Sequence, residues 1–255
     1  MKPLLRVFNI ILFLLLWMFS SHVFGSEIRV AVASNFLKPL KYIARIYEQE
    51  TGEKVFISSG STGKLYAQIV NGAPYDVFLA ANSREPQRLE KEGYASNGSR
   101  FTYARGKLAL WDPKGSYQFA TLEQVLKMAD YKRLSLANPL TAPYGEAAFS
   151  VLKNIGIEKM PQKKILRGEN ISQAFQYVAS GAADLGFIAL SQITASGKKL
   201  TGHYWEVNEN LHQPILQQAV LLTNAGPKIQ GKKFLNYLKS SKGQAMIETF
   251  GYGLL

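Results

Sequence analysis

The stretch Ile28-Arg29-Val30-Ala31-Val32-Ala33-Ser34-Asn35 decides the fold class, because it is an apolar run that ends in two small polar residues. Its first six residues predict a buried strand. Residues 37–51 carry apolar side chains at helical spacing, and Gly52 is suited to end that helix. A buried strand that leads directly into an amphipathic helix is the repeating unit of parallel α/β sheets.

The same pattern recurs in the next part of the chain. We predict a strand over residues 55–58, a helix over residues 64–71 and a strand over residues 75–81. Three strands with two intervening helices are the start of a doubly wound sheet.

Two longer strand-like runs divide the rest of the chain. Residues 101–111 contain Arg105-Gly106-Lys107 at their centre, and residues 214–223 contain the pair Gln217-Gln218. Between the two runs lies a second α/β series, with strands predicted over 133–138 and 184–189 and helices over 145–154 and 171–180. Two long strands that bracket a complete α/β block predict two crossovers between two lobes.

The C-terminal helices, predicted over residues 232–238 and 242–250, would return to the first lobe. We therefore predict lobe 1 over residues 26–104 and 218–255, and lobe 2 over residues 105–217. Ligands of doubly wound sheets bind beyond the carboxyl ends of the strands, so a cleft between the lobes is the expected site.

The first twenty-five residues have the pattern of a secretory signal peptide. Lys2 and Arg6 flank the start of an apolar run over residues 7–18, and Gly25 is a suitable small residue for cleavage. The alternative is a permanent membrane anchor, but this run is shorter than the ~20 residues that span a bilayer. The chain has no cysteine, which excludes lipid attachment at the new N-terminus and disulfides. We expect residues 1–25 to be removed and the protein to be free in the periplasm.

Composition is that of an ordinary α/β chain, with 47% apolar residues and no internal repeat. The formal charge of +12 falls to +10 when Lys2 and Arg6 leave with the signal peptide. The remaining cations are scattered, and export argues against a nucleic-acid partner. A solvated basic surface and attraction of small anions both stay open.

Polar residues follow three of the strand-like runs at the point where each opens into a helix. They are Ser34-Asn35, Gly60-Ser61-Thr62-Gly63-Lys64 and Ala142-Pro143-Tyr144-Gly145. Backbone N–H groups and hydroxyls could converge there on an anion. Ser34 could instead only cap the helix that follows it. Leu65 stands where a nucleotide-binding loop would have its hydroxyl, so we interpret Lys64 as a surface residue.

The sequence does not favour an enzyme. His22 leaves with the signal peptide, and His203 and His212 lie in an irregular region without zinc-site spacing. Residues 60–63 lack the spacing of a serine-hydrolase elbow. We expect no catalytic residue, no metal centre and no cofactor.

Four segments, residues 32–36, 59–65, 72–78 and 181–186, resemble in order the periplasmic molybdate-binding proteins, the solute receptors of molybdate ABC transporters. The resemblance implies a type II periplasmic binding protein fold, with two lobes that are each a doubly wound mixed sheet and with two crossover strands. It also implies a small oxyanion ligand, molybdate or tungstate, and a membrane permease as partner of a monomeric receptor.

The resemblance also implies a ligand set drawn from both lobes. The first lobe would supply Ser34, Asn35, Ser61 and Thr62, and the second Ala142, Tyr144, Asn170 and Ile171. The molybdate oxyanion would be held chiefly through Ser34, Thr62, Tyr144 and Ile171. One branch of the family takes its tyrosine from the strand where this chain has Ala189. Tyr144 matches the tyrosine of a second branch. Pro143 has no N–H, at a position where the first branch could donate one.

The chemistry of these residues agrees with a fully deprotonated anion. Molybdate has only acceptors, and hydroxyls and helix-start amides are donors. Hydrogenphosphate carries a proton and would favour a carboxylate, and Glu146 and Glu169 lie close to the predicted positions. A receptor for sulfate or thiosulfate, and an exported enzyme on the same scaffold, remain the alternatives.

Overall fold

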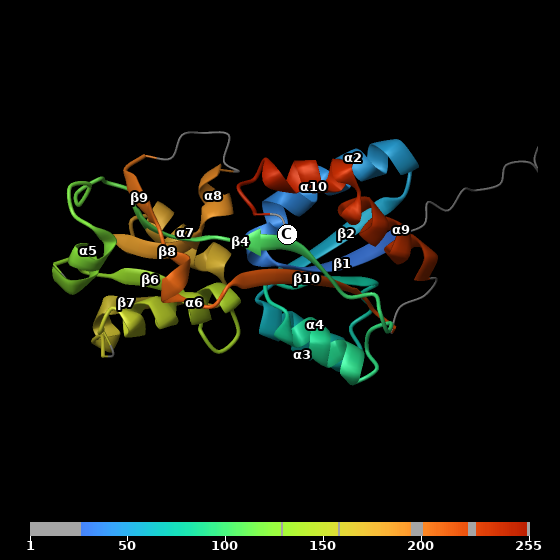
Figure 1. Ribbon diagram of the computed structural model, residues 1–255, viewed down its shortest axis with the longest axis horizontal. Coiled ribbons are helices and arrows are strands. Elements are labelled where there is room, and N and C mark those ends of the chain that lie inside the picture. Colours follow the sequence, from blue (N-terminus) through green and yellow to red (C-terminus); the bar gives the residue numbers. More distant parts are fainter. Residues whose placement is uncertain (1–26, 129, 158, 195–200, 224–227, 254–255) are drawn as a thin grey trace, which may run out of the picture.

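The chain forms two mixed five-stranded sheets that lie side by side, each with helices packed on it (Figure 1). The computed structural model describes residues 27–128, 130–157, 159–194, 201–223 and 228–253. The predicted signal peptide therefore lies outside the described residues. The predicted α/β fold with two lobes is confirmed.

The first sheet has the strand order β2-β1-β3-β10-β4. The central strand β1 (Glu27–Ala33) pairs in parallel with β2 (Lys54–Gly60) and β3 (Val77–Leu79). The late strand β10 (Ile215–Leu221) then inserts antiparallel between β3 and β4 (Phe101–Gly106). A strand from the end of the chain thus completes a sheet that the N-terminal residues begin.

Helices cover both faces of the first sheet. On one face lie α2 (Leu37–Thr51), α9 (Lys228–Lys239) and α10 (Ser241–Glu248), and on the other α3 (Thr62–Val70) and α4 (Arg84–Lys91). The helix predicted over residues 37–51 is confirmed to the residue. It ends because Gly52 adopts a left-handed conformation, with φ of 73°.

The second sheet has the order β7-β6-β8-β5-β9. Strands β7 (Ile165–Gly168), β6 (Leu134–Ala137) and β8 (Leu185–Ala189) are parallel. The neighbouring strand β5 (Leu108–Asp112) is antiparallel to both β8 and β9 (His203–Glu206). Both lobes therefore combine three parallel strands with an antiparallel pair.

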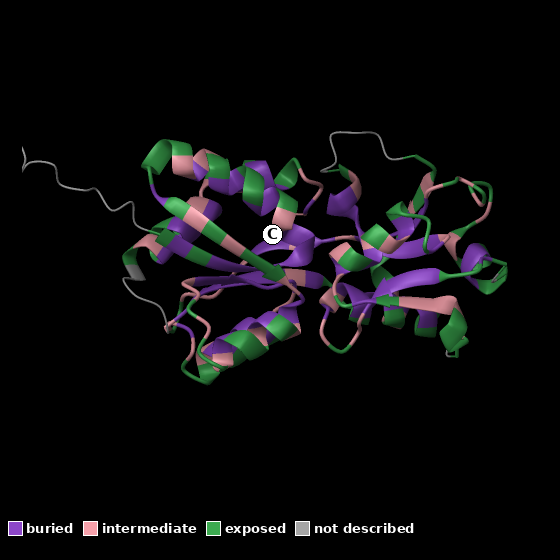
Figure 2. Cartoon of the chain, turned by 180° about the vertical axis from the view of Figure 1, so that it is seen from behind, coloured by how far each residue is buried: buried purple, intermediate pink, exposed green. Residues whose placement is uncertain are grey.

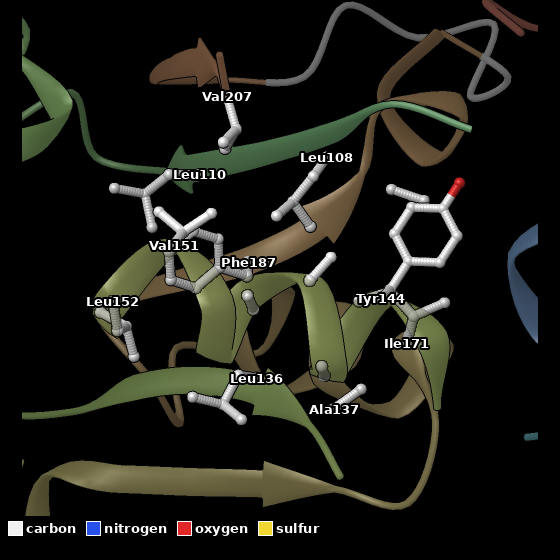
Figure 3. Close-up of a cluster of buried hydrophobic side chains, with 14 of the residues drawn as sticks. Leu108, Leu110, Leu136, Ala137, Tyr144, Val151, Leu152, Ile171, Phe187 and Val207 are labelled. Carbon is white, nitrogen blue, oxygen red and sulfur yellow. The ribbon is translucent and has the colours of Figure 1, made fainter. Parts of the chain in front are cut away.

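The core of the second lobe lies between its sheet and its helices, α5 (Leu122–Met128), α6 (Pro143–Asn154), α7 (Ile171–Ala179) and α8 (Leu190–Thr194). Val151 of α6 packs with Leu110 and Phe187 of the sheet (Figure 3). On the other face Phe175 of α7 stacks on Trp111. Three short 3-10 turns complete the described structure, η1 (Ser34–Phe36), η2 (Gln162–Lys164) and η3 (Glu209–Leu211).

The long strand predicted over residues 101–111 is in fact two strands, because the chain changes sheet at Lys107. Strand-like residues lie on both sides of Arg105-Gly106-Lys107, so the sequence predicts one continuous strand, although this polar stretch coincides with the break. Gly106 pairs with Ile215 in the first sheet, and the return connection covers residues 207–214. The lobe limits predicted at residues 104/105 and 217/218 therefore fall inside β4 and β10.

The carboxyl ends of the parallel strands place the polar helix starts together. Ala33 at the end of β1 is in register with Gly60 at the end of β2, and Ala137 of β6 with Gly168 of β7. Strands β1 and β6 are largely buried inside their lobes, whereas the edge strands β2 and β7 are mostly half-buried or exposed, and Figure 2 shows further exposed residues on the outer helices. In the described ranges, no helix has the length and apolar character needed to cross a membrane.

Candidate ligand-binding site between the lobes

The site is a small cavity where helix starts from both lobes meet. Its volume is ≈ 10 Å³, about the room of one water molecule. It is lined by Ala33, Ser34, Asn35, Thr62, Ala81, Ala142, Pro143, Tyr144, Asn170 and Ile171. All the predicted ligand residues except Ser61 are in this set, and their roles as ligands stay predictions.

Thr62 is the first residue of α3 and is 1% exposed. Its Oγ1 accepts a hydrogen bond from the N–H of Ala81 at 3.0 Å. The hydroxyl proton of Thr62 is then available to a ligand. The N–H groups of the first helical turn also have no acceptor within the helix, so the Thr62 amide is a second donor at this point.

Ser34 does not cap the helix that follows it. Its side chain makes no cap hydrogen bond, because the 3-10 turn η1 separates Ser34 from the first residue of α2. Instead Ser34 contacts the second lobe. Its Oγ accepts from the N–H of Ser172 at 3.4 Å, and its carbonyl accepts from the hydroxyl of Ser172 at 3.0 Å.

Asn35 lines the cavity, but its side-chain amide is used within the protein. The Nδ2 group donates to Oε1 of Gln217 at 2.8 Å and to the hydroxyl of Tyr252 at 3.0 Å. Its two amide protons are therefore committed to buried partners. A contribution of Asn35 to a bound anion would have to come from its backbone N–H.

Tyr144 reaches the cavity from the second residue of α6 and is 1% exposed. Figure 3 shows its ring beside the aliphatic core and its hydroxyl turned away from the leucine and valine side chains. The hydroxyl oxygen accepts from Nε2 of Gln217 at 3.2 Å. Burial, reinforced by the neighbouring Tyr252 and Tyr103, raises the pKa of Tyr144 well above its ordinary value, so the hydroxyl keeps its proton.

The remaining second-lobe residues differ in the donors that they leave free for a ligand. The N–H of Ala142 is occupied, since it donates to the carbonyl of Asn138 at 2.9 Å. The side chain of Asn170 caps α7, its Oδ1 accepting from Ser172 and Gln173 at 3.0 and 3.1 Å. The cap leaves the N–H of Ile171, the first residue of α7, without an intrahelical acceptor.

Ser61 lies beside the cavity rather than in its wall. It is the N-cap residue of α3 and is 3% exposed, but its side chain makes no cap hydrogen bond. Within the described part of the chain its Oγ has no hydrogen-bond partner. A buried hydroxyl without a partner is a donor that a ligand or a water molecule can satisfy.

No carboxylate lines the cavity among the described residues, and Glu169 and Glu146, which lie close to predicted ligand residues in the sequence, are both paired. Lys64 Nζ lies 2.6 Å from Oε1 of Glu169, and Arg84 Nη1 lies 3.5 Å from Oε2 of Glu146. Both ion pairs join one lobe to the other. The N–H of Gly63 also donates to the carbonyl of Thr141 at 2.9 Å, so the lobes are closed on each other.

The arrangement offers hydroxyl and amide donors to a buried ligand and no charged acceptor. Within the described ranges, no group of three or more histidine, aspartate and glutamate side chains could hold a metal ion. Sequence reasoning missed the side chains behind the ligand residues, chiefly Gln217, Tyr252 and Ser191. The one available signal for Gln217 was a polar pair inside an otherwise apolar strand.

Two lobes with a donor-lined site between them define a solute-binding protein. Residues 28–253 match the model of the bacterial extracellular solute-binding proteins. The chain belongs to that family.

Similar proteins include the molybdate-binding protein ModA of Azotobacter vinelandii, 48% identical over 90% of this chain and 91% of that protein. The ModA protein of Rhodobacter capsulatus is 39% identical over 89% of this chain and 88% of its own. The solved structure of the A. vinelandii periplasmic molybdate-binding protein matches with a TM-score of 0.86 at 41% identity, over 90% of this chain and 100% of that one. The resemblance seen in the sequence is thereby confirmed.

Proposed function

We propose that this protein binds molybdate between its two lobes in the periplasm and delivers it to the permease of an ABC transporter. Tungstate, which has the same charge and shape, is proposed as a second ligand. The protein acts as a receptor and not as an enzyme. Its molybdate-binding relatives and the donor-lined site support this proposal.

The main observation behind the proposal is that the cavity offers hydrogen-bond donors and no charged acceptor. Thr62 and Tyr144 each accept one hydrogen bond from the protein and keep a proton to donate. The first residues of α3, α6 and α7 also line the cavity, and the N-terminus of a helix carries free N–H groups and a partial positive charge. A dianion without protons satisfies all of these donors, whereas hydrogenphosphate would leave its own proton without an acceptor.

Binding requires the lobes to separate. A cavity of ≈ 10 Å³ holds about one water molecule and cannot hold a four-oxygen anion. Among the described residues, the chain passes from one sheet to the other at Lys107 and over residues 207–214, so we take these two connections as the hinge. We propose that opening at this hinge admits the anion and that closure brings the donors of both lobes onto it.

Titration calorimetry with molybdate, tungstate, sulfate, thiosulfate and phosphate tests the ligand assignment. We expect molybdate and tungstate to bind much more tightly than the others. Equal affinity for sulfate would overturn the molybdate assignment and leave an oxyanion receptor. Chemical change of any added anion would favour the enzyme alternative instead.

Residues 1–25 are proposed to direct export and then to be removed, which would release a monomer beginning near Ser26. Mass spectrometry of the exported protein measures this N-terminus, and sedimentation measures the oligomeric state. A full-length product retained in the membrane would show that residues 7–18 are an anchor.

A further inference from the structure

Gln217 is a fully buried polar residue that connects the two lobes behind the proposed site. It lies in β10 of the first sheet and is 0% exposed. Its Oε1 accepts from Nδ2 of Asn35 at 2.8 Å. This oxygen also lies 3.0 Å from the hydroxyl of Tyr103, whose single proton it shares with the carbonyl of Ala80 at 3.1 Å. Its Nε2 donates to the hydroxyl of Tyr144, in the second lobe, at 3.2 Å.

The direction of these hydrogen bonds is fixed by a backbone carbonyl, which can only accept. The carbonyl of Asn35 accepts from the hydroxyl of Tyr252 at 3.0 Å. The oxygen of Tyr252 is then free to accept from Nδ2 of Asn35, so the Asn35 side chain turns its NH₂ group, and not its oxygen, toward Tyr252. With Nδ2 of Asn35 also donating to Oε1 of Gln217, only Nε2 of Gln217 can face Tyr144.

These hydrogen bonds determine which way the Tyr144 hydroxyl donates. Its oxygen accepts from Gln217, so its single proton points to another partner. Tyr144 lines the cavity, where an anion would take that proton as a hydrogen bond. A buried tyrosine beside other tyrosines keeps its proton, so it remains a donor.

The fold makes room for this hydrogen bond by placing a glycine beside it. A Cβ atom on Gly106 would lie 2.6 Å from Nε2 of Gln217 and would collide with the hydroxyl of Tyr144. Gly106 ends β4 at the point where the chain leaves the first sheet. The hydrogen bond between Gln217 and Tyr144 therefore lies directly beside the residue at which the chain crosses from the first sheet to the second.

We propose that Gln217 is a specificity-determining positioning residue, which fixes the Tyr144 hydroxyl as a donor and so selects fully deprotonated oxyanions. The inference rests on the proposed function. It assigns to Gln217 no contact with the ligand. If Gln217 carried an acceptor in place of Nε2, the Tyr144 proton would turn toward it and the site would lose a donor.

Gln217→Glu makes that exchange with little change of size. The carboxylate keeps the bonds from Asn35 and Tyr103 and accepts the proton of Tyr144. We expect molybdate affinity to fall roughly ten- to a hundredfold at pH 8, the range for one charge-assisted hydrogen bond. The ratio of molybdate to hydrogenphosphate affinity should fall as well, because the Tyr144 oxygen can now accept a proton from the ligand.

The pH profile separates this role from simple damage to the fold. Burial raises the pKa of a carboxyl group, and the protonated acid can again donate to Tyr144. Affinity of Gln217→Glu should therefore recover as pH falls from 8.5 to 5.5, while the parent stays constant. Gln217→Met, which has neither donor nor acceptor, should bind more weakly than the parent at every pH, without recovery.

A double-mutant cycle with Tyr144→Phe completes the test. In the Tyr144→Phe background, Gln217→Glu should change molybdate affinity less than twofold. Parent-like binding by Gln217→Glu at all pH values, or an equal loss in both backgrounds, would overturn the inference alone. Parent-like binding by Tyr144→Phe would overturn the inference together with the tyrosine's place in the site. If the parent binds no oxyanion, the proposed function itself fails.

Discussion

Lys64 and Glu169 form an ion pair across the mouth of the cleft, with Nζ and Oε1 2.6 Å apart. Lys64 lies in the first turn of α3 and Glu169 just before α7, so the pair joins the two lobes beside the proposed site. The carboxylate of Glu169 is thereby neutralised where it would otherwise repel an anion. The lysine predicted to be a surface residue is exposed, yet it contacts the opposite lobe.

Loss of this ion pair should speed release of the ligand only modestly. Both side chains are at least half exposed, and such pairs are worth up to ~1 kcal/mol. We expect Lys64→Met to raise the dissociation rate of molybdate about two- to fivefold at low salt, and less at high salt. Stopped-flow displacement measures the rate, with Lys41→Met on the exposed face of α2 as control. A much larger loss that persists at high salt would show that Lys64 contacts the anion.

Thr62 should contribute both to binding and to stability. Thr62→Val keeps the shape but leaves the N–H of Ala81 without its acceptor, at a cost of ~1–3 kcal/mol in the free energy of unfolding. It also removes one donor to the anion, which should weaken molybdate binding roughly ten- to a hundredfold. Thr62→Ser keeps the hydroxyl and is the matched control. If the valine variant is less stable but binds like the parent, Thr62 is only structural.

The sequence was sufficient to predict most strands and helices in order, because these depend on local hydrophobic spacing, but it did not lead us to predict α4, α5, α8, β7 and β9. It did not reveal the break at Lys107, since the choice of sheet depends on partners such as Ile215, far along the chain. The polar helix starts were also predictable from local pattern. The use of each side chain was not, because Asn35 donates to Gln217, which lies 182 residues away.

Buried tyrosines should make the protein sensitive to alkali. Burial, with a smaller effect of Tyr117, raises the pKa of Tyr131 to about 12. The pKa of a tyrosine in the unfolded chain is ~10. Because the pKa is higher in the folded chain, the protonated tyrosine adds stability. This contribution is fully present below pH ~10 and is lost as the pH rises through the pKa of the folded chain. Between pH 9 and pH 12 the parent should lose about 2 kcal/mol more than Tyr131→Phe.

Denaturant unfolding across that pH range measures the difference. Tyr204→Phe is the control, since Tyr204 is 45% exposed. Parallel pH curves for the parent and Tyr131→Phe would show that Tyr131 ionises equally in the folded and unfolded chain.

Gly106 should be intolerant of even a methyl group, although its backbone does not require glycine. In Gly106→Ala the new Cβ would press on Nε2 of Gln217 and the hydroxyl of Tyr144, neither of which has space to retreat within the buried network. We expect the free energy of unfolding to fall by ~1–3 kcal/mol, as for other overpacked sites. Molybdate affinity should fall at least tenfold, because the clash displaces the tyrosine that would donate to the anion.

Gly253→Ala is the matched control, since its Cβ would meet its nearest neighbour, in Arg105, at an ordinary 3.4 Å. Calorimetry and unfolding measurements on both variants decide the matter, and parent-like binding by Gly106→Ala would mean that the Tyr144 hydroxyl can move without loss to the ligand.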